Sequence, residues 1–101
     1  MKQCCKEYLM EQFGDEEVVN EIYAEYVNSV REKIPELEAA LTAENWTMLD
    51  RLAHAVKGNA LATGDTEAAN VAIALRSAAK MSEKDTAVSL FAKLKELAEG
   101  I

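Results

Sequence analysis

The sequence contains few of the residues that interrupt helices or build sheets. One of its 101 residues is proline, four are glycine, and aromatic residues make up 6%. No run alternates β-branched and aromatic residues as a strand would, whereas Ala, Leu, Glu and Lys, which favour helix, dominate throughout. We therefore expect an all-α protein. A chain of this length is expected to form one domain, 1–101.

Cysteines and long apolar runs are also scarce. The only two cysteines, Cys4 and Cys5, are adjacent and poorly placed to bridge each other, so no disulfide framework can be drawn. No uncharged run approaches the roughly 18 residues of a membrane span, and the N-terminal segment has no apolar core of signal-peptide length. These absences favour a reduced, cytoplasmic setting without a membrane span.

Basic residues are outnumbered, with 11 Lys and Arg against 18 Asp and Glu, a formal net charge of -7. The excess lies in residues 1–44, which hold eleven acidic and four basic side chains, whereas residues 45–101 hold seven of each. An acidic surface disfavours nucleic acid and anionic membrane, because both require clustered cations. A protein or small-ligand partner is expected instead.

Apolar periodicity predicts a short helix followed by four longer ones. The short helix spans residues 2–12, with Cys5, Leu9 and Phe13 four apart, and ends at Gly14. The next begins at the cap Asp15 and carries two apolar rows: Val18, Ile22, Tyr26 and Val30, flanked by Val19, Tyr23, Val27 and Ile34. Pro35 either ends this helix or, preferably, kinks it.

Three further helices complete the prediction. The first runs from Trp46, capped by Asn45, to about Thr63, where Gly64 closes it. The next starts at Asp65 or Thr66, and "SEKD" at 82–85 predicts a capping box for the last, which continues to Gly100. Four substantial helices with short connections are expected to form an antiparallel up-and-down four-helix bundle over 15–99, with helix 1–13 as a lid.

The helix from Trp46 carries two distinct stripes. At 100° per residue its core stripe consists of Leu49, Leu52, Ala53, Val56 and Ala60. A second stripe, turned largely away from the first, contains His54, Lys57, Gly58 and Leu61. The only histidine of the chain is therefore expected to face outward.

Gly58 changes how this histidine is interpreted. A lone histidine is an ordinary residue satisfied by hydrogen bonds about as often as it is a functional one. A glycine in the middle of a helix, however, costs about 1 kcal/mol relative to alanine, so a functional reason for it is expected. Its missing Cβ would let a partner's backbone approach the ring of His54. Lys57 is placed to neutralise phosphate oxygens on that ring, although alone it could be an ordinary solvated lysine. Leu61 suits a docking surface or the edge of the core.

The stretch "LAHAVKGNALATG", preceded by "AENWTMLDR", resembles the core motif of histidine phosphotransfer (HPt) domains. In that motif the histidine is followed at +3 by lysine, at +4 by glycine, and by a second glycine near the helix end. The resemblance in helix order and spacing covers about residues 13–97. It leaves out the N-terminal dozen residues.

The resemblance implies a four-helix bundle that acts as a phosphorelay intermediate in two-component signal transduction. His54 would accept a phosphoryl group from the aspartate of a response-regulator receiver domain and pass it on, with Lys57 neutralising charge. Arg51, Gly58 and Leu61 would form the docking face. The chain would be a phosphoprotein that acts as a phosphate carrier and not as an autonomous enzyme. It would have no cofactor of its own, because magnesium is expected on the receiver. Partners would be a receiver domain and a hybrid sensor histidine kinase.

Two positions depart from the family pattern, and other chemistries lack support. Asn59 stands where a small Ser or Ala is common, and Arg76 with Ser77 replaces an acidic residue. No GxxxxGK[ST], GxGxxG or GxSxG motif occurs. His54 with Cys4 and Cys5 lacks the paired spacings of a zinc motif, so no metal site is predicted.

The alternative function is a non-phosphorylated helical adaptor that binds a signalling protein through the same face. A monomer is expected, because the bundle needs no second chain. The cognate kinase and receiver, the pathway output, the direction of phosphate flow and a place within a hybrid kinase stay open. Met1 and the closing Gly100 favour a complete short protein.

Overall fold

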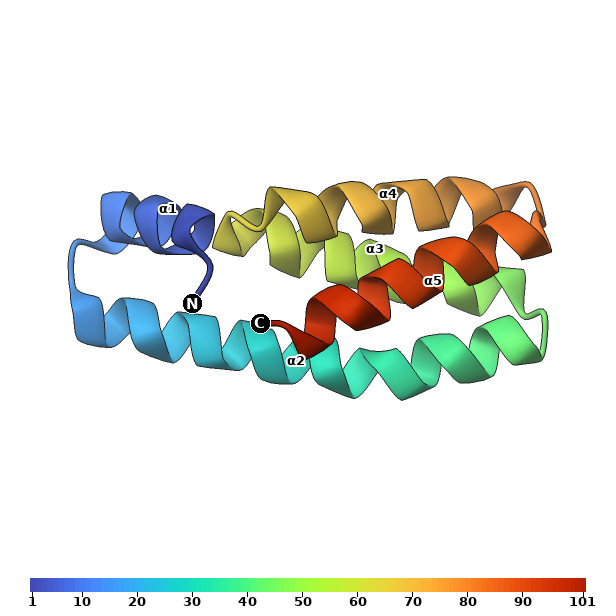
Figure 1. Cartoon of the computed structure of the whole chain (residues 1–101), viewed down its shortest axis with the longest axis horizontal. Coiled ribbons are helices and arrows are strands. Elements are labelled where there is room, and N and C mark those ends of the chain that lie inside the picture. Colours follow the sequence, from blue (N-terminus) through green and yellow to red (C-terminus); the bar gives the residue numbers. More distant parts are fainter.

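The computed structural model describes all residues, 1–101, and consists of five α-helices without a strand, which confirms the all-α prediction. The helices are α1 (Gln3–Phe13), α2 (Glu16–Thr42), α3 (Trp46–Thr63), α4 (Thr66–Lys80) and α5 (Lys84–Glu99). The molecule is elongated, with principal extents of 42 × 19 × 19 Å, and α2 runs along most of its length (Figure 1). None of the helices combines the length and the hydropathy needed to span a membrane.

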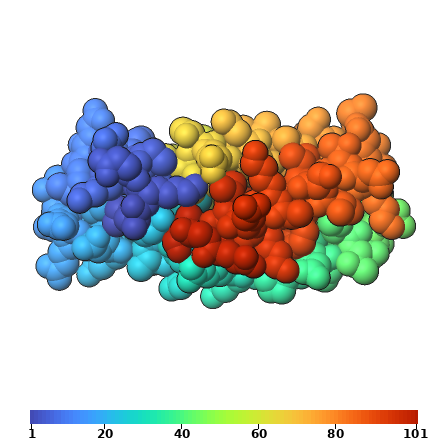
Figure 2. All heavy atoms as spheres, in the orientation of Figure 1, coloured from blue at the N-terminus to red at the C-terminus, as the bar shows by residue number.

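The helices α2 and α4 each pack against both α3 and α5, and α1 packs on α2 and α3. In Figure 1, α1 lies beside the first turns of α2, at the end of the molecule where α3 meets α4. Figure 2 shows that α1 and α5 share one face, with α1 over one end and α5 over the middle and the other end. The extra helix thus extends one end of the bundle.

Most predicted helix ends are confirmed by their capping contacts. Asp15 accepts from the backbone N–H groups of Glu17 and Val18, and Asn45 and Asp65 cap α3 and α4 in the same way. Gly64 ends α3 with a φ of 78°, a left-handed conformation that side chains with a Cβ rarely adopt. These local signals place both ends of α3 and the start of α4.

One alternative left open at Pro35 is excluded, and one predicted helix start is wrong. The helix α2 continues through Pro35 to Thr42, so it does not end there; Leu37, Ala40 and Leu41 beyond the proline are buried, and their burial offsets the cost of the ring. The capping box at 82–85 does not form. Ser82 adopts a φ of 53° in the turn, so Glu83 becomes the N-cap residue and makes no side-chain capping bond.

Small side chains make up most of the buried faces of α3 and α4. Alanines at 53, 60, 68 and 72 are at most 3% exposed, and they let the two helices approach closely. Phe13 and Val18 were expected in apolar rows, yet both are exposed. Phe13 is the last residue of α1, and at the start of α2 the neighbouring Val19 is buried while Val18 faces outward. Leu52 is half-buried at the edge of its predicted stripe.

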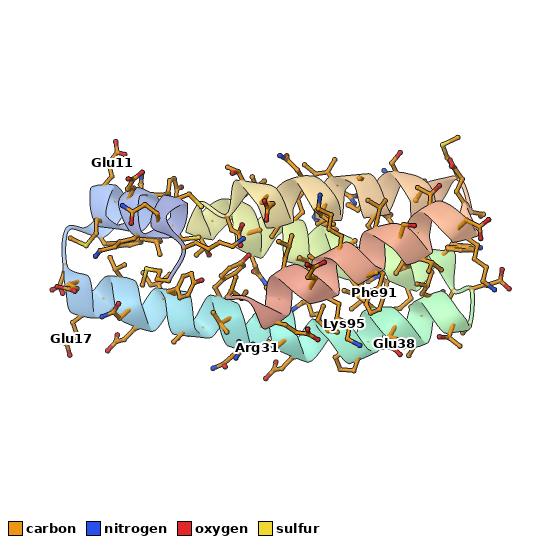
Figure 3. All side chains as sticks on the ribbon, viewed as in Figure 1. Glu11, Glu17, Arg31, Glu38, Phe91 and Lys95 are labelled. Atoms are coloured by element: carbon orange, nitrogen blue, oxygen red, sulfur yellow. The ribbon has the colours of Figure 1, made fainter.

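The far end of α5 is tied to α2 by Arg31. Its Nη2 donates to the backbone carbonyl of Ile101 at 2.9 Å, and its Nε donates to that of Ala98 at 3.4 Å. Figure 3 shows Arg31 on α2 below the C-terminal turn of α5. This contact closes the bundle on the side formed by α2 and α5. On the other side, α3 packs on α2 and α4.

Candidate functional site on helix α3

The helix α3 presents the predicted stripe outward. Leu49, Ala53, Val56 and Ala60 are fully buried on its inner side. His54, Gly58 and Leu61 are exposed, and Lys57 is half-buried beside them. The 3.6-residue period separates the two stripes because a helix places residues three and four apart on one face. The outward orientation predicted for the histidine is therefore present in the structure.

The ring of His54 is free of intramolecular partners. No hydrogen bond or ion pair of the chain engages either ring nitrogen, and the ammonium group of Lys57 is likewise unpaired. A buried structural histidine would need partners for its polar nitrogens. An exposed imidazole with an unpaired cation one turn away can instead act on a group that arrives from outside.

Gly58 is not required by packing within the chain. A Cβ built on Gly58 would meet no heavy atom within 4 Å. Gly64 is the opposite case, because a Cβ there would lie 2.5 Å from Cβ of Tyr8. The space outside Gly58 is thus open beside His54, and the helix retains the propensity cost of glycine with no intramolecular gain.

The remaining predicted docking residues lie along the same helix. Arg51, one turn before His54, is exposed and forms no ion pair. Leu61, about two turns after it, is 50% exposed although it is a large apolar side chain. The stripe therefore combines an imidazole, two unpaired cations and an apolar surface, a composition suited to a partner that carries negative charge.

The two departures from the family motif join α3 to its neighbours. Nδ2 of Asn59 donates to Oγ of Ser29 on α2 at 2.9 Å. Nε of Arg76 on α4 donates to Oδ1 of Asp50 at 2.9 Å, and Asp50 lies one turn before His54. These contacts flank the stripe on its two sides. The sequence does not predict these contacts, because the spacing of residues along α3 does not indicate which residues of α2 and α4 lie opposite.

A buried carboxylate that the sequence indicated only as a cap lies at the end of α3. Asp65 is fully buried and accepts from the Tyr26 hydroxyl at 2.7 Å, from Lys2 Nζ at 2.9 Å and from the backbone N–H of Ala68. Burial and the hydrogen bond of its hydroxyl to Asp65 raise the pKa of Tyr26. Burial lowers the pKa of Lys2, but the bond to Asp65 and its charge outweigh that effect, so the net shift is upward.

The cysteines form no site with the histidine. Both thiols are free; Cys4 is exposed, and Cys5 is fully buried on the inner side of α1. Burial, followed by the nearby charge of Asp65, raises the pKa of Cys5 to about 12, so this thiol is not a ready nucleophile. No three His, Cys, Asp or Glu side chains of the chain are grouped so that they could hold a metal ion.

The comparison with known families agrees with the geometry of α3. The family model described as Hpt domain matches residues 21–101, a range that contains His54 and leaves out α1. The chain matches no curated protein and no solved structure. Hpt domains are helical bundles that carry phosphoryl groups on histidine in phosphorelay signalling, and they interact with receiver domains and histidine kinases. The chain belongs to the Hpt domain family.

Proposed function

We propose that this chain is a phosphorelay intermediate whose His54 accepts a phosphoryl group from the aspartate of a receiver domain and passes it on. The observation that carries the proposal is the outward position of His54 beside an open glycine. The phosphoaspartate arrives on another protein, so the acceptor ring must be reachable without obstruction. Gly58 supplies that clearance one turn from the ring.

The transfer needs no base from this chain. The lone pair of a ring nitrogen of neutral His54 attacks phosphorus and forms a P–N bond, while the acyl phosphate P–O bond breaks and its electron pair returns to the aspartate carboxylate. The other ring nitrogen keeps its proton, so the product ring carries a positive charge. Lys57 offsets the charge of the phosphoryl oxygens. The receiver and its magnesium supply the remaining alignment and neutralisation.

Docking follows from the exposed residues around the ring. Arg51 and Lys57 would meet the acidic phosphorylation site of a receiver, and Leu61 would meet an apolar part of its surface. The four helices α2 to α5 serve as an antiparallel up-and-down bundle that holds α3 in place, with α1 as an added lid. In this proposal the domain works as a cytoplasmic monomer between a hybrid histidine kinase and a receiver.

The experiment compares the wild-type chain with His54→Gln in a mixture with a radiolabelled, phosphorylated receiver. Wild type should take up label that is labile to acid and stable to alkali, as a P–N bond requires, and His54→Gln should take up none. Binding of the receiver, measured by calorimetry, should change little. A helical adaptor would bind the receiver equally well, yet the wild-type chain would remain unlabelled, and that outcome would overturn the proposal.

A further inference from the structure

A groove runs between α1, which lies outside the residues that the family model matches, and the end of α3, which lies inside them. It has a volume of about 470 Å³, and its walls include Glu7, Tyr8 and Glu11 of α1, Leu61 of α3, and the turn at Gly64. Tyr8 and Leu61 are 37% and 50% exposed, so the groove has an apolar floor open to solvent. The helix α1 thus adds a surface that the rest of the bundle lacks.

The groove has a fixed shape, because α1 is anchored at several points. The side chain of Tyr8 occupies the space that a Cβ at Gly64 would fill. Lys2 is paired with the buried Asp65 at the start of α4, and Cys5 and Leu9 on the inner side of α1 are fully buried. A wall held by an ion pair and two buried side chains presents its outer residues in one arrangement, which favours selective docking.

Leu61 belongs both to this groove and to the His54 stripe. It follows His54 by seven residues, which corresponds to about 10 Å along a helix. A protein interface of standard size covers about 800 Å² on each partner, a patch roughly 30 Å across. A receiver centred on His54 therefore extends over Leu61 to the groove.

The charge of the groove is opposite to that of the stripe. Glu7 and Glu11 are the only charged residues in its lining, and neither forms an ion pair within the chain. Glu7 accepts only a neutral donor, Nε2 of Gln3, at 3.0 Å. Glu11 points outward from α1 (Figure 3). The stripe, in contrast, presents Arg51 and Lys57, so the combined surface is basic at one end and acidic at the other.

We infer that the groove is a second docking site for the receiver, one that takes an apolar side chain flanked by Lys or Arg on the receiver's surface. This inference rests on the proposed function, since the receiver must first be placed at His54. The apolar side chain would cover Tyr8 and Leu61, and the flanking cations would meet Glu7 and Glu11. The site would select among receivers, because a receiver with acidic residues at that position would be repelled.

The test reverses the charge of the groove with Glu7→Lys/Glu11→Lys. Its control, Glu96→Lys/Glu99→Lys, makes the same change at exposed positions near the end of α5, which does not line the groove. Receiver domains from the genome that encodes this chain are charged with acetyl phosphate, and kcat/KM for transfer to His54 is measured for each at low and high salt. The receiver that transfers fastest to the wild-type chain is used for the comparison.

The groove variant should lose roughly tenfold in kcat/KM with that receiver at low salt and less at high salt, because charges at an interface rim act mainly on association. Its kcat should stay within about twofold of wild type, as should all constants of the control. Equal losses in both variants, or none in either, would overturn the groove site while leaving transfer to His54 intact. Absence of label on the wild-type chain with every receiver would overturn the proposed function and this inference with it.

Discussion

The hydroxyl of Tyr26 donates a 2.7 Å hydrogen bond to Oδ2 of Asp65, whose other oxygen lies 2.9 Å from Nζ of Lys2. One fully buried carboxylate thus joins α2, the residue before α1 and the first turn of α4. A buried charge that loses a partner retains its desolvation cost. The position of α1 beside the candidate site therefore depends on this carboxylate.

Removal of the Tyr26 hydroxyl should destabilise the protein. Tyr26→Phe leaves one oxygen of Asp65 without its donor, which is expected to lower the free energy of unfolding by about 1–3 kcal/mol. Tyr23→Phe is the matched control, because the Tyr23 hydroxyl only accepts a long 3.5 Å bond from the backbone N–H of Lys2. Urea denaturation checks both variants. Equal losses from the two would contradict the role given to Asp65.

Alkaline pH should destabilise the wild-type chain more steeply than Cys5→Ala. Burial, followed by the charge of Asp65, raises the pKa of Cys5 from 9.0 to about 12. Between these values the thiol is protonated in the folded state and ionised in the unfolded state, so stability present below pH 9 is lost as pH rises through this window. The variant is less stable near neutral pH because it leaves a cavity.

The measurement for Cys5→Ala is the slope of unfolding free energy against pH, from urea denaturation between about pH 8 and 10.5. The tyrosines and Lys2 titrate in both proteins, so the difference between the two slopes reports the thiol together with its effect on the pKa of Tyr23 and Tyr26. A variant that declines as steeply as wild type would show that Cys5 ionises equally in the folded and unfolded states.

Gly58→Ala should raise stability and slow phosphotransfer. The added Cβ meets nothing within 4 Å, so the helix gains about 0.5–1 kcal/mol in propensity without a clash. The same methyl group occupies the space through which a receiver reaches His54. Thermal unfolding and the transfer rate from a phosphorylated receiver check the two effects. A variant that is less stable, or one that transfers as fast as wild type, would contradict the access role of Gly58.

The ion pair of Asp50 and Arg76 should tolerate an exchange of the two charges between the positions, but not the reversal of one charge alone. Arg76→Glu places two carboxylates together and should cost about 1 kcal/mol, a modest amount because both side chains are partly exposed, at 28% and 23%. Asp50→Arg/Arg76→Glu should recover most of that loss. Urea denaturation of the two variants provides the measurement. A double variant as unstable as Arg76→Glu alone would show that the pair does not join α3 to α4.

Local features account for what could be predicted on α3. The period of apolar residues, the caps Asn45 and Asp65, and the closing glycine all act within a few residues, so the stripe with His54 was predicted from them. The motif around His54 is also contiguous. Its outward position follows because a helix whose inner side is buried must expose the other side.

Contacts between distant segments could not be predicted in this way. Asp65 or Thr66 is the predicted start of α4, and Asp65 caps it, but its partners Lys2 and Tyr26 lie 63 and 39 residues away. The same holds for Arg76, whose partner depends on how α3 and α4 align. Ser82 failed as a cap because the turn before α5 gives it a positive φ, a preference that the four-residue pattern does not encode.

The most direct test of the account is the nitrogen spectrum of the imidazole. His54 is the only histidine, so both ring ¹⁵N signals belong to it without assignment. With a receiver, magnesium and acetyl phosphate present, one ring ¹⁵N signal should shift and split through coupling to ³¹P, and the change should require the receiver. Unchanged ring signals while the chain carries phosphate at another residue, or while it carries none, would contradict the assignment of His54 as the acceptor.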